Sequence, residues 1–329
     1  VPGWTGEYDW TGYIPYEELP AIRNPGNGLV VAANNKIVPD SYPHLLTTHW
    51  PAHFRALRIT ELLESDPEAA DGLPLEANRR IQTDIVSLAA PALMERLHDT
   101  EPPSERGRNA LELLAAWNGA MDRERPEPLL FYAWMRALNR ALLADELGPD
   151  FESFQKPNAE LLIQIFDEGP EWCDDVTTGP TETCAEQRTT ALETALDDLA
   201  ERFDAPLAEL RWGEAHRAPF AHPVFSKVPL LGTLLGYPVE SDGGTYTVNT
   251  GGMRFRDEAP FANLHGPGYR AFYDMAEPEE SLYMIATGQS GNPLSAHWGD
   301  LVPLWRDGDY LKLDGRGTAQ ADRLVLTPR

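Results

Sequence analysis

The sequence predicts an α+β fold in which two β-rich terminal segments flank a long helical middle. Residues 1–50 are rich in glycine, proline and aromatic residues that alternate as in strands and turns. Apolar residues at helical spacing run through residues 51–204, and short strand patterns return in residues 205–329. Because β segments lie at both ends of the chain, we expect them to share one sheet, with the helices inserted between them.

The first β-rich segment contains "YDWTGYIPYEELP", whose alternation favours strands and turns, and then the apolar run "GLVVAANNKIVPD". The apolar part of this run stops at the adjacent amides Asn34 and Asn35. Asparagine often closes a strand, because it tolerates left-handed backbone geometry and bonds to its own backbone. An asparagine fixed at a strand end can also aim its amide N–H at a reacting oxygen. The run alone leaves both interpretations open.

The helical middle begins at "PAHFRALRITELLESD", where Pro51 suits a first turn and apolar side chains lie broadly on one face. Those side chains are Phe54, Leu57, Ile59, Leu62 and Leu63. The same spacing predicts helices in five further stretches: "LPLEANRRIQTDIVSLAAPALMERL", "ERGRNALELLAAWNGAMD", "PEPLLFYAWMRALNRALLADEL", "NAELLIQIFDEG" and "AEQRTTALETALDDLAERF".

The second β-rich segment is predicted from three stretches after Trp212. "GGTYTVNTGG" indicates a hairpin between glycine turns, while "SLYMIATGQSGNP" and "DYLKL" indicate short strands. A glycine-rich loop cradles phosphate when it opens a helix, and nothing after "GGTYTVNTGG" has helical spacing. We therefore expect no phosphate site there.

Composition excludes several classes of partner. The 329 residues are 42% hydrophobic and carry a formal net charge of -25, which disfavours nucleic acid and anionic membrane surfaces as partners. No apolar run reaches the roughly 18 to 20 residues that a transmembrane helix needs. The first ten residues, "VPGWTGEYDW", have neither the basic nor the apolar region of a signal peptide.

The two cysteines, Cys173 and Cys184, bound the acidic stretch "CDDVTTGPTETC". A disulfide between them would close a short loop and indicate a periplasmic or secreted protein. Two free or metal-binding thiols are the alternative. The stretch contains no CxxC pair and no histidine, so we favour the disulfide.

Two other groups of residues invite a catalytic interpretation. "TGQSGN" resembles a serine-hydrolase nucleophile elbow around Ser290, with His297 and Asp300 following. The elbow pattern is broken by Asn292 and Pro293, so we expect a loop without a catalytic triad.

The histidines of "HWPAH", His49 and His53, lack the glutamate of a zinc-protease helix. We expect these two histidines and the nearby His44 to pack against neighbouring side chains or cap helices, and not to bind metal. The 52 acidic residues make carboxylate pairs frequent by chance, so no glycosidase-like pair is assigned.

Several separate stretches, taken in order along the chain, resemble the large subunit of the penicillin acylase family. The first is "VPGWTGEYDWTGYIPYEELPAIRNPGNGLVVAANNKI", followed by "HWPAHFRALRITELL". Further along, the similar stretches are "WCDD", "RWGEAHRAPFAHPVF", "GPGYRAFYDM", "GQSGNPLSAHWGD" and "LVPLW". The resemblance covers essentially the whole chain, which is similar to the C-terminal part of the family's large β subunit.

This resemblance implies part of a four-layer αββα fold of the N-terminal nucleophile hydrolases and the hydrolysis of an amide bond. In that family the first serine of the β subunit attacks the substrate, with its own α-amine as general base, and an asparagine side chain helps to hold the oxyanion. The matching asparagine here is Asn34, and Arg55 matches the family's nearby arginine. Asn35 is then expected to be the turn residue.

The resemblance also implies what this chain does not supply. Val1 carries no nucleophile, and the likeness begins inside the β subunit, so we expect the catalytic serine to lie outside these residues. The implied partners are the α subunit, the N-terminal part of the β subunit and a small acyl amide such as a penicillin, a cephalosporin side chain or an acyl-homoserine lactone. Some members bind Ca²⁺. Here the matching ligand position falls near His44, where the only adjacent acid is Asp40, so no cofactor is assigned to this chain.

Two alternative functions remain open. One is a hydrolase based on Ser290, which would require Ser290, His297 and Asp300 to lie within hydrogen-bond reach. The other is a secreted small-molecule-binding module without catalysis. In a binding module, the aromatic clusters of the chain would bind the small molecule, and Asn34 and Arg55 would be expected to lie apart.

Overall fold

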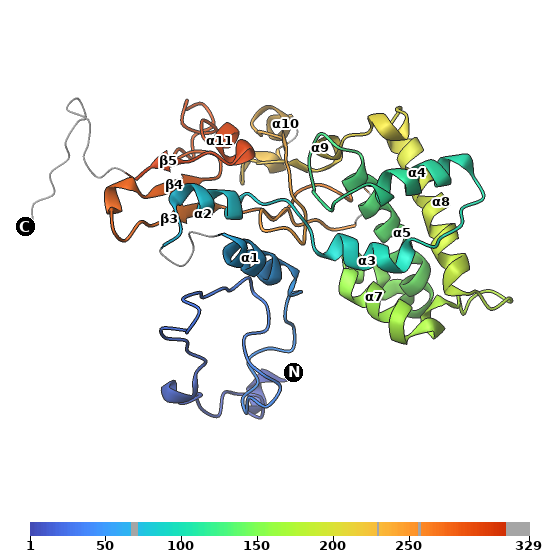
Figure 1. Ribbon diagram of the computed structural model, residues 1–329, viewed down its shortest axis with the longest axis horizontal. Coiled ribbons are helices and arrows are strands. Elements are labelled where there is room, and N and C mark those ends of the chain that lie inside the picture. Colours follow the sequence, from blue (N-terminus) through green and yellow to red (C-terminus); the bar gives the residue numbers. More distant parts are fainter. Residues whose placement is uncertain (67–71, 229, 256–257, 314–329) are drawn as a thin grey trace, which may run out of the picture.

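The computed structural model describes residues 1–66, 72–228, 230–255 and 258–313, in which helices dominate the middle and short strands follow (Figure 1). The α-helices are α1 (Phe54–Ser65), α2 (Leu75–Gln82), α3 (Ala89–Leu97), α4 (Glu105–Ala115), α5 (Glu127–Leu147), α6 (Phe151–Phe154), α7 (Ala159–Glu168), α8 (Cys184–Arg202), α9 (Trp212–Ala215), α10 (Leu231–Leu234) and α11 (Val302–Asp307). The strands are β1 (Arg217–Ala218), β2 (Val239–Glu240), β3 (Tyr269–Phe272), β4 (Leu282–Ile285) and β5 (Leu311–Lys312).

The main core forms around α5, whose N-terminal half is buried on nearly every side. It packs along α8, and the indole N–H of Trp134 donates to the carbonyl of Arg188 at 3.1 Å. A helix that is apolar all round is expected at the centre of such a bundle. The helices predicted from apolar spacing are confirmed here.

One predicted helical stretch, residues 73–97, is divided into α2 and α3. The break contains β-branched residues, which favour helix weakly, and an aspartate that competes for backbone groups. The carboxylate of Asp84 accepts from Arg58 at 3.0 and 2.9 Å and from the N–H of Val86 at 3.2 Å. These bonds keep the backbone around Asp84 in a non-helical conformation between α2 and α3.

The strands form two small antiparallel sheets. β1 pairs with β2, with Arg217 opposite Glu240, and the second sheet has the order β3-β4-β5. In that sheet Tyr269 lies opposite Ile285, and the buried side chains of Met284 and Trp305 form a small second core. The strands predicted in "SLYMIATGQSGNP" and "DYLKL" are confirmed as β4 and β5.

The β-rich character expected of residues 1–50 differs from the structure. This segment, which is fully described, contains only 3-10 turns at Gly3–Thr5 and Tyr16–Glu18 and no strand. Its one buried residue is Ala33, so no apolar face is available to hold a sheet. Within the described residues, the expected sheet shared by both ends of the chain is therefore absent, and the two sheets found there come from residues 217–312.

The hairpin expected for "GGTYTVNTGG" is also wrong. A single parallel bridge joins Gly244 to Thr250, and the turn between them is held by the hydroxyl of Thr247, which donates to the carbonyl of Asn249 at 2.7 Å. The side chain of Tyr246 turns into the helical core, where its hydroxyl accepts the N–H of Ala159 at 2.8 Å. Packing against the helices thus takes precedence over strand pairing.

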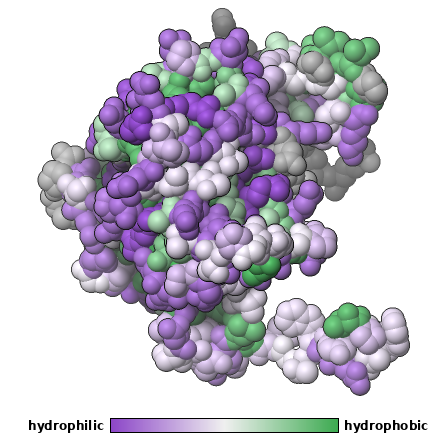
Figure 2. All heavy atoms as spheres, turned by 90° about the vertical axis from the view of Figure 1, so that its right-hand side faces the viewer, coloured by the Kyte–Doolittle hydropathy of each residue, from purple (hydrophilic) through white to green (hydrophobic). Residues whose placement is uncertain are grey.

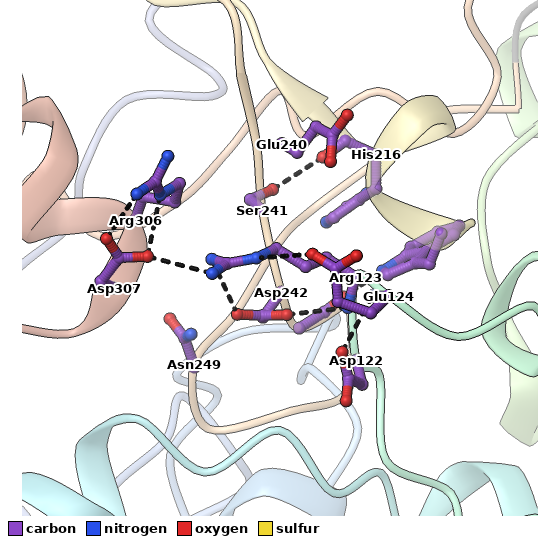
Figure 3. A network of polar contacts seen from close by, with 12 residues as sticks. Asp122, Arg123, Glu124, His216, Glu240, Ser241, Asp242, Asn249, Arg306 and Asp307 are labelled. Carbon is purple, nitrogen blue, oxygen red and sulfur yellow. Dashed lines mark hydrogen bonds and ion pairs between the residues drawn. The ribbon is translucent and has the colours of Figure 1, made fainter.

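A network of charged residues joins this loop to the helical body and to α11 (Figure 3). Arg123 donates its backbone N–H to Asp242 at 2.8 Å, and its guanidinium contacts Asp242 at 3.3 Å and Asp307 at 3.1 Å. Arg306 also contacts Asp307, at 2.6 and 2.8 Å. Burial raises the pKa of Asp242, and its bonds from Arg123 oppose that rise. The network fixes the relative positions of three parts of the chain.

The N-terminal segment, residues 1–50, runs away from this body below α1 (Figure 1). In the turned view of Figure 2 it forms the lowest part of the molecule and stands clear of the body. Its backbone hydrogen bonds, within the described residues, are local turns such as Gly28 N–H to Pro25 at 2.9 Å. Among the described helices, none is both long and apolar enough to cross a membrane.

Candidate active site

Asn34 lies in the middle of a tight bend at residues 33–35, which follows residues 29–32 that belong to no helix or strand. Its φ is +64°, a left-handed conformation that asparagine adopts more readily than most residues. The residue is exposed, in contrast to the buried Ala33 before it. The turn therefore presents the amide of Asn34 at the surface of the chain.

Arg55, in the first turn of α1, anchors this turn. Its Nη2 donates to the carbonyl of Ala33 at 2.8 Å and to Oδ1 of Asn34 at 2.9 Å. The side-chain oxygen of Asn34 is thus occupied by a charged donor. Its Nδ2 makes no hydrogen bond within the described part of the chain, so that N–H is free to bind another oxygen.

The Arg55 guanidinium has only neutral acceptors. Within the described residues, no carboxylate lies at ion-pair distance from it. Burial lowers the pKa of Arg55 below its ordinary value, but an arginine stays charged at neutral pH. The turn therefore carries an uncompensated positive charge directly behind the Asn34 amide, which strengthens the amide as a donor to an anion.

The structure brings Asn34 and Arg55 together, which the binding-module alternative did not predict. It does not bring together the Ser290 triad. Nδ1 of His297 contacts Asp300 at 2.8 Å, but Oγ of Ser290 accepts the N–H of Asn292 at 3.1 Å. Across the described chain, Ser290 reaches His297 only through its backbone N–H, at 3.0 Å from the carbonyl. No helix begins directly after the serine, because residues 291–301 form mostly turns and bends, so the elbow geometry is missing.

The candidate metal-ligating residues are separated and already paired. Nε2 of His44 contacts Glu18 at 2.5 Å, and Nδ1 of His53 contacts Glu160 at 3.1 Å. Asp40 pairs with Lys36, which lowers the pKa of its carboxyl group. Within the described ranges, no group of three or more histidine, cysteine or acidic side chains is placed to hold a metal ion.

Sequence reasoning missed the buried His216. Its ring stacks on Trp212 at 4.3 Å between centroids, and its Nδ1 contacts the carbonyl of Phe261 at 2.7 Å. Its Nε2 is buried and has no hydrogen-bond partner in the described structure. Burial lowers the pKa of His216 to about 4. A single histidine in "RWGEAHRAPF" carries no periodic or spacing signal, so only the packing reveals it.

Two cavities of the described structure lie apart from the Asn34 turn. One of about 870 Å³ lies between α4, the end of α8 and residues 205–210. Another, of about 470 Å³, lies beside the start of α1 and is lined by His53 and Phe54 together with α3 and α7. Neither is lined by Asn34 or Arg55, and Asn34 itself lies exposed in its turn.

Comparison with known proteins gives a consistent result. Residues 1–320 match the family described as penicillin amidase. The chain is 30% identical over 314 residues to the penicillin acylase 2 proenzyme of Pseudomonas sp. (strain SE83), covering 93% of this chain and 39% of that protein. It is 27% identical to the acyl-homoserine lactone acylase QuiP of Pseudomonas syringae pv. syringae (strain B728a), covering 99% and 42%.

Among solved structures, the thermostable penicillin G acylase of Alcaligenes faecalis aligns with a TM-score of 0.62 and 18% identity. The alignment covers 98% of this chain and 61% of that one, and at this identity it bears on the fold alone. The chain spans about two fifths of the length of the curated relatives that it matches.

Proposed function

Because this chain belongs to the penicillin amidase family, we propose that it is part of an acyl amide hydrolase and supplies the oxyanion-hole residue Asn34. The fold that contains it is the four-layer αββα arrangement of the N-terminal nucleophile hydrolases. The observation that carries the proposal is the bond from Arg55 to Oδ1 of Asn34, which leaves the amide N–H as the available donor.

The reaction runs in two acyl-transfer steps. A serine hydroxyl from a part of the enzyme outside these residues attacks the amide carbonyl, and the serine α-amine takes the hydroxyl proton. The tetrahedral intermediate collapses to an acyl-enzyme as the leaving amine accepts a proton. Water then attacks the acyl-enzyme and releases the carboxylic acid and the free serine.

Asn34 acts where negative charge develops on the carbonyl oxygen. A donor that is already oriented needs no reorganisation, and one such donor contributes about 2.7–4 kcal/mol to transition-state stabilisation. Arg55 orients the amide and adds a positive charge behind it. Both effects are larger in the transition state than in the ground state, so they act on kcat.

The partners of this chain would be the α subunit and the N-terminal part of the β subunit. Support comes from residues 1–50, where large aromatic side chains have no packing partner in the described structure. Trp4 is 89% exposed, Trp10 93% and Tyr13 96%. Apolar surface of this kind marks a protein interface. The same segment carries Asn34, so a partner that covers it would also meet the candidate site.

Substrate and location follow from the same membership. The relatives are named for penicillin and acyl-homoserine lactone, so the proposed substrate is a small acyl amide of these classes. A periplasmic or secreted location is supported by the disulfide between Cys173 and Cys184.

We derive no step through calcium. The nearby acid, Asp40, is paired with Lys36, and the described residues bring no further acid to it. A calcium ion needs six to eight oxygen ligands, and the part of the chain that the structure describes places no group of three or more histidine, cysteine or acidic side chains to hold one.

The test is amide hydrolysis by the full-length gene product with phenylacetyl and fatty-acyl chromogenic amides. We expect Asn34→Ala to lower kcat by about 10²–10³-fold, with a smaller change in KM. Ser290→Ala serves as the control and should keep wild-type activity, because its hydroxyl bonds only within its own loop. An inactive Ser290→Ala enzyme beside a fully active Asn34→Ala enzyme would favour the serine-hydrolase alternative.

A further inference from the structure

Asn35, the second amide of the pair, makes two hydrogen bonds to the backbone of the turn. Its Oδ1 accepts the N–H of Ala33 at 3.1 Å, and its Nδ2 donates to the carbonyl of Lys36 at 3.1 Å. Both functions of this side-chain amide are therefore used inside the turn. Asn34 differs, since only its oxygen is engaged.

Ala33 is where the contacts of the turn converge. Its N–H is held by Asn35 and its carbonyl by Arg55, at 3.1 and 2.8 Å. It is also the single buried residue of the fully described segment 1–50, with 6% of its surface exposed. The peptide groups on both sides of Ala33 are thus fixed, and the second of them joins Ala33 to Asn34. Asn35 and Arg55 hold opposite ends of the same residue.

The backbone of Asn34 needs such support. Its φ of +64° is a conformation that most L-residues avoid, and an exposed turn has little packing to enforce it. Arg55 fixes the side-chain oxygen of Asn34 and the carbonyl of Ala33, but a rotation of the Ala32–Ala33 peptide would still move the amide as a whole. The bond from Ala33 to Asn35 restricts that rotation. Beyond Asn35, Lys36 pairs with Asp40 and closes the other side of the turn.

We propose that Asn35 is a positioning residue, which holds the Ala32–Ala33 peptide while Arg55 holds the Ala33–Asn34 peptide, so that the free N–H of Asn34 points toward the reacting oxygen. This proposal rests on the proposed function of Asn34. It changes the role expected for Asn35, from an ordinary strand-closing residue to a part of the site. The two amides thus have different roles: Asn34 binds the substrate oxygen, and Asn35 orients Asn34.

The experiment compares Asn35→Ala with Asn27→Ala in the full-length gene product. Asn27 is a matched control, because its Oδ1 also accepts a backbone N–H two residues away, from Leu29 at 3.2 Å, in the same segment. We expect Asn35→Ala to lower kcat by roughly 10- to 100-fold with KM within about twofold, since a small displacement of an oriented group is costly in rate. Asn27→Ala should match the wild type.

A double-mutant cycle separates positioning from general damage. If Asn35 acts through Asn34, adding Asn35→Ala to Asn34→Ala should cost about twofold or less, because the donor to be positioned is already gone. Loss of structure would instead multiply the two effects. Titration of the active sites with a serine-directed acylating probe corrects each kcat for the fraction of competent enzyme.

A conservative variant covers the case in which Asn35→Ala does not fold. Asn35→Asp keeps an acceptor for the N–H of Ala33 and should retain more activity than Asn35→Ala. The proposal is overturned if both Asn35 variants keep the wild-type kcat, or if the effects of Asn34→Ala and Asn35→Ala multiply. An active Asn34→Ala enzyme would instead reject the proposed function itself, so the two failures are distinguishable.

Discussion

At the scale of single residues, His216 makes the stability of the fold depend on pH. Burial lowers its pKa from 6.5 to about 4, so the folded state excludes a proton that the unfolded state binds. Well above pH 6.5 both states are neutral, and this residue then has no pH-dependent effect. As the pH falls from 6.5 to 4, the free energy of unfolding should decrease by about 3 kcal/mol.

The measurement is urea unfolding at pH 7.5 and pH 4.5 for the wild type and His216→Gln. The variant cannot titrate, and its amide can still donate to the carbonyl of Phe261. We expect the wild type to lose about 2–3 kcal/mol more than the variant between these pH values. Equal losses in the two proteins would show that His216 is not the titrating group.

Asn34 and His216 illustrate what the sequence can predict about single residues. The contact between Asn34 and Arg55 was predicted, because two motifs that resemble one family place them near each other. The bonds of Asn35 follow from turn geometry that a sequence pattern does not resolve. His216 could not be found at all, since its environment is made by Trp212 stacking on its ring and by the distant Phe261.

At the scale of elements, the disulfide ties the start of α8 to the turn that follows α7. Cys173 is fully buried and its partner Cys184 is the first residue of α8. A cross-link over 11 positions removes conformational entropy from the unfolded chain, which corresponds to about 3 kcal/mol of stability in the chain-entropy account. Thr183 and Glu186 add a reciprocal cap at the same helix end.

We therefore expect the double variant Cys173→Ala, Cys184→Ala to unfold at a lower urea concentration, with a loss of about 3 kcal/mol. Dithiothreitol should destabilise the wild type by a similar amount and leave the double variant unchanged. The control is Thr183→Ala, which removes a cap worth about 1 kcal/mol but should keep the sensitivity to dithiothreitol. A wild type that is insensitive to complete reduction would contradict the assignment of a stabilising role to this bond.

The helices and strands were predictable to different degrees for a physical reason. A helix such as α5 satisfies its own backbone, so its apolar spacing suffices to identify it. A strand depends on a partner that lies elsewhere in the chain. The loop around Tyr246 has strand-like composition but packs against the helices, and residues 1–50 alternate without finding a sheet.

At the scale of the whole molecule, the structure has two unequal parts. The network around Arg123 joins the helical body to the small sheets, whereas among the described residues the side-chain hydrogen bonds from the body to residues 1–50 come from Arg55. The aromatic composition of that segment was visible in the sequence, but whether its side chains are buried could not be predicted, because burial depends on what covers them. The candidate site lies at the base of this segment, where Arg55 meets the turn.

This division predicts where proteases act. Chymotrypsin cleaves after aromatic residues in accessible, locally unfolded backbone, and residues 1–50 offer Trp10, Tyr13 and Tyr16 at 93%, 96% and 83% exposure. The first cuts in the chain alone should fall there and leave the helical body intact. In the chain assembled with the α subunit and the N-terminal part of the β subunit, the same cuts should slow by about tenfold or more, because a partner buries these side chains. Tyr273, which is 60% exposed and lies in the body, is the internal control and should be cut at the same rate in both samples. Equal rates at Trp10 and Tyr13 in the two samples would mean that the partner does not cover this segment, and the proposed assembly around Asn34 would be wrong.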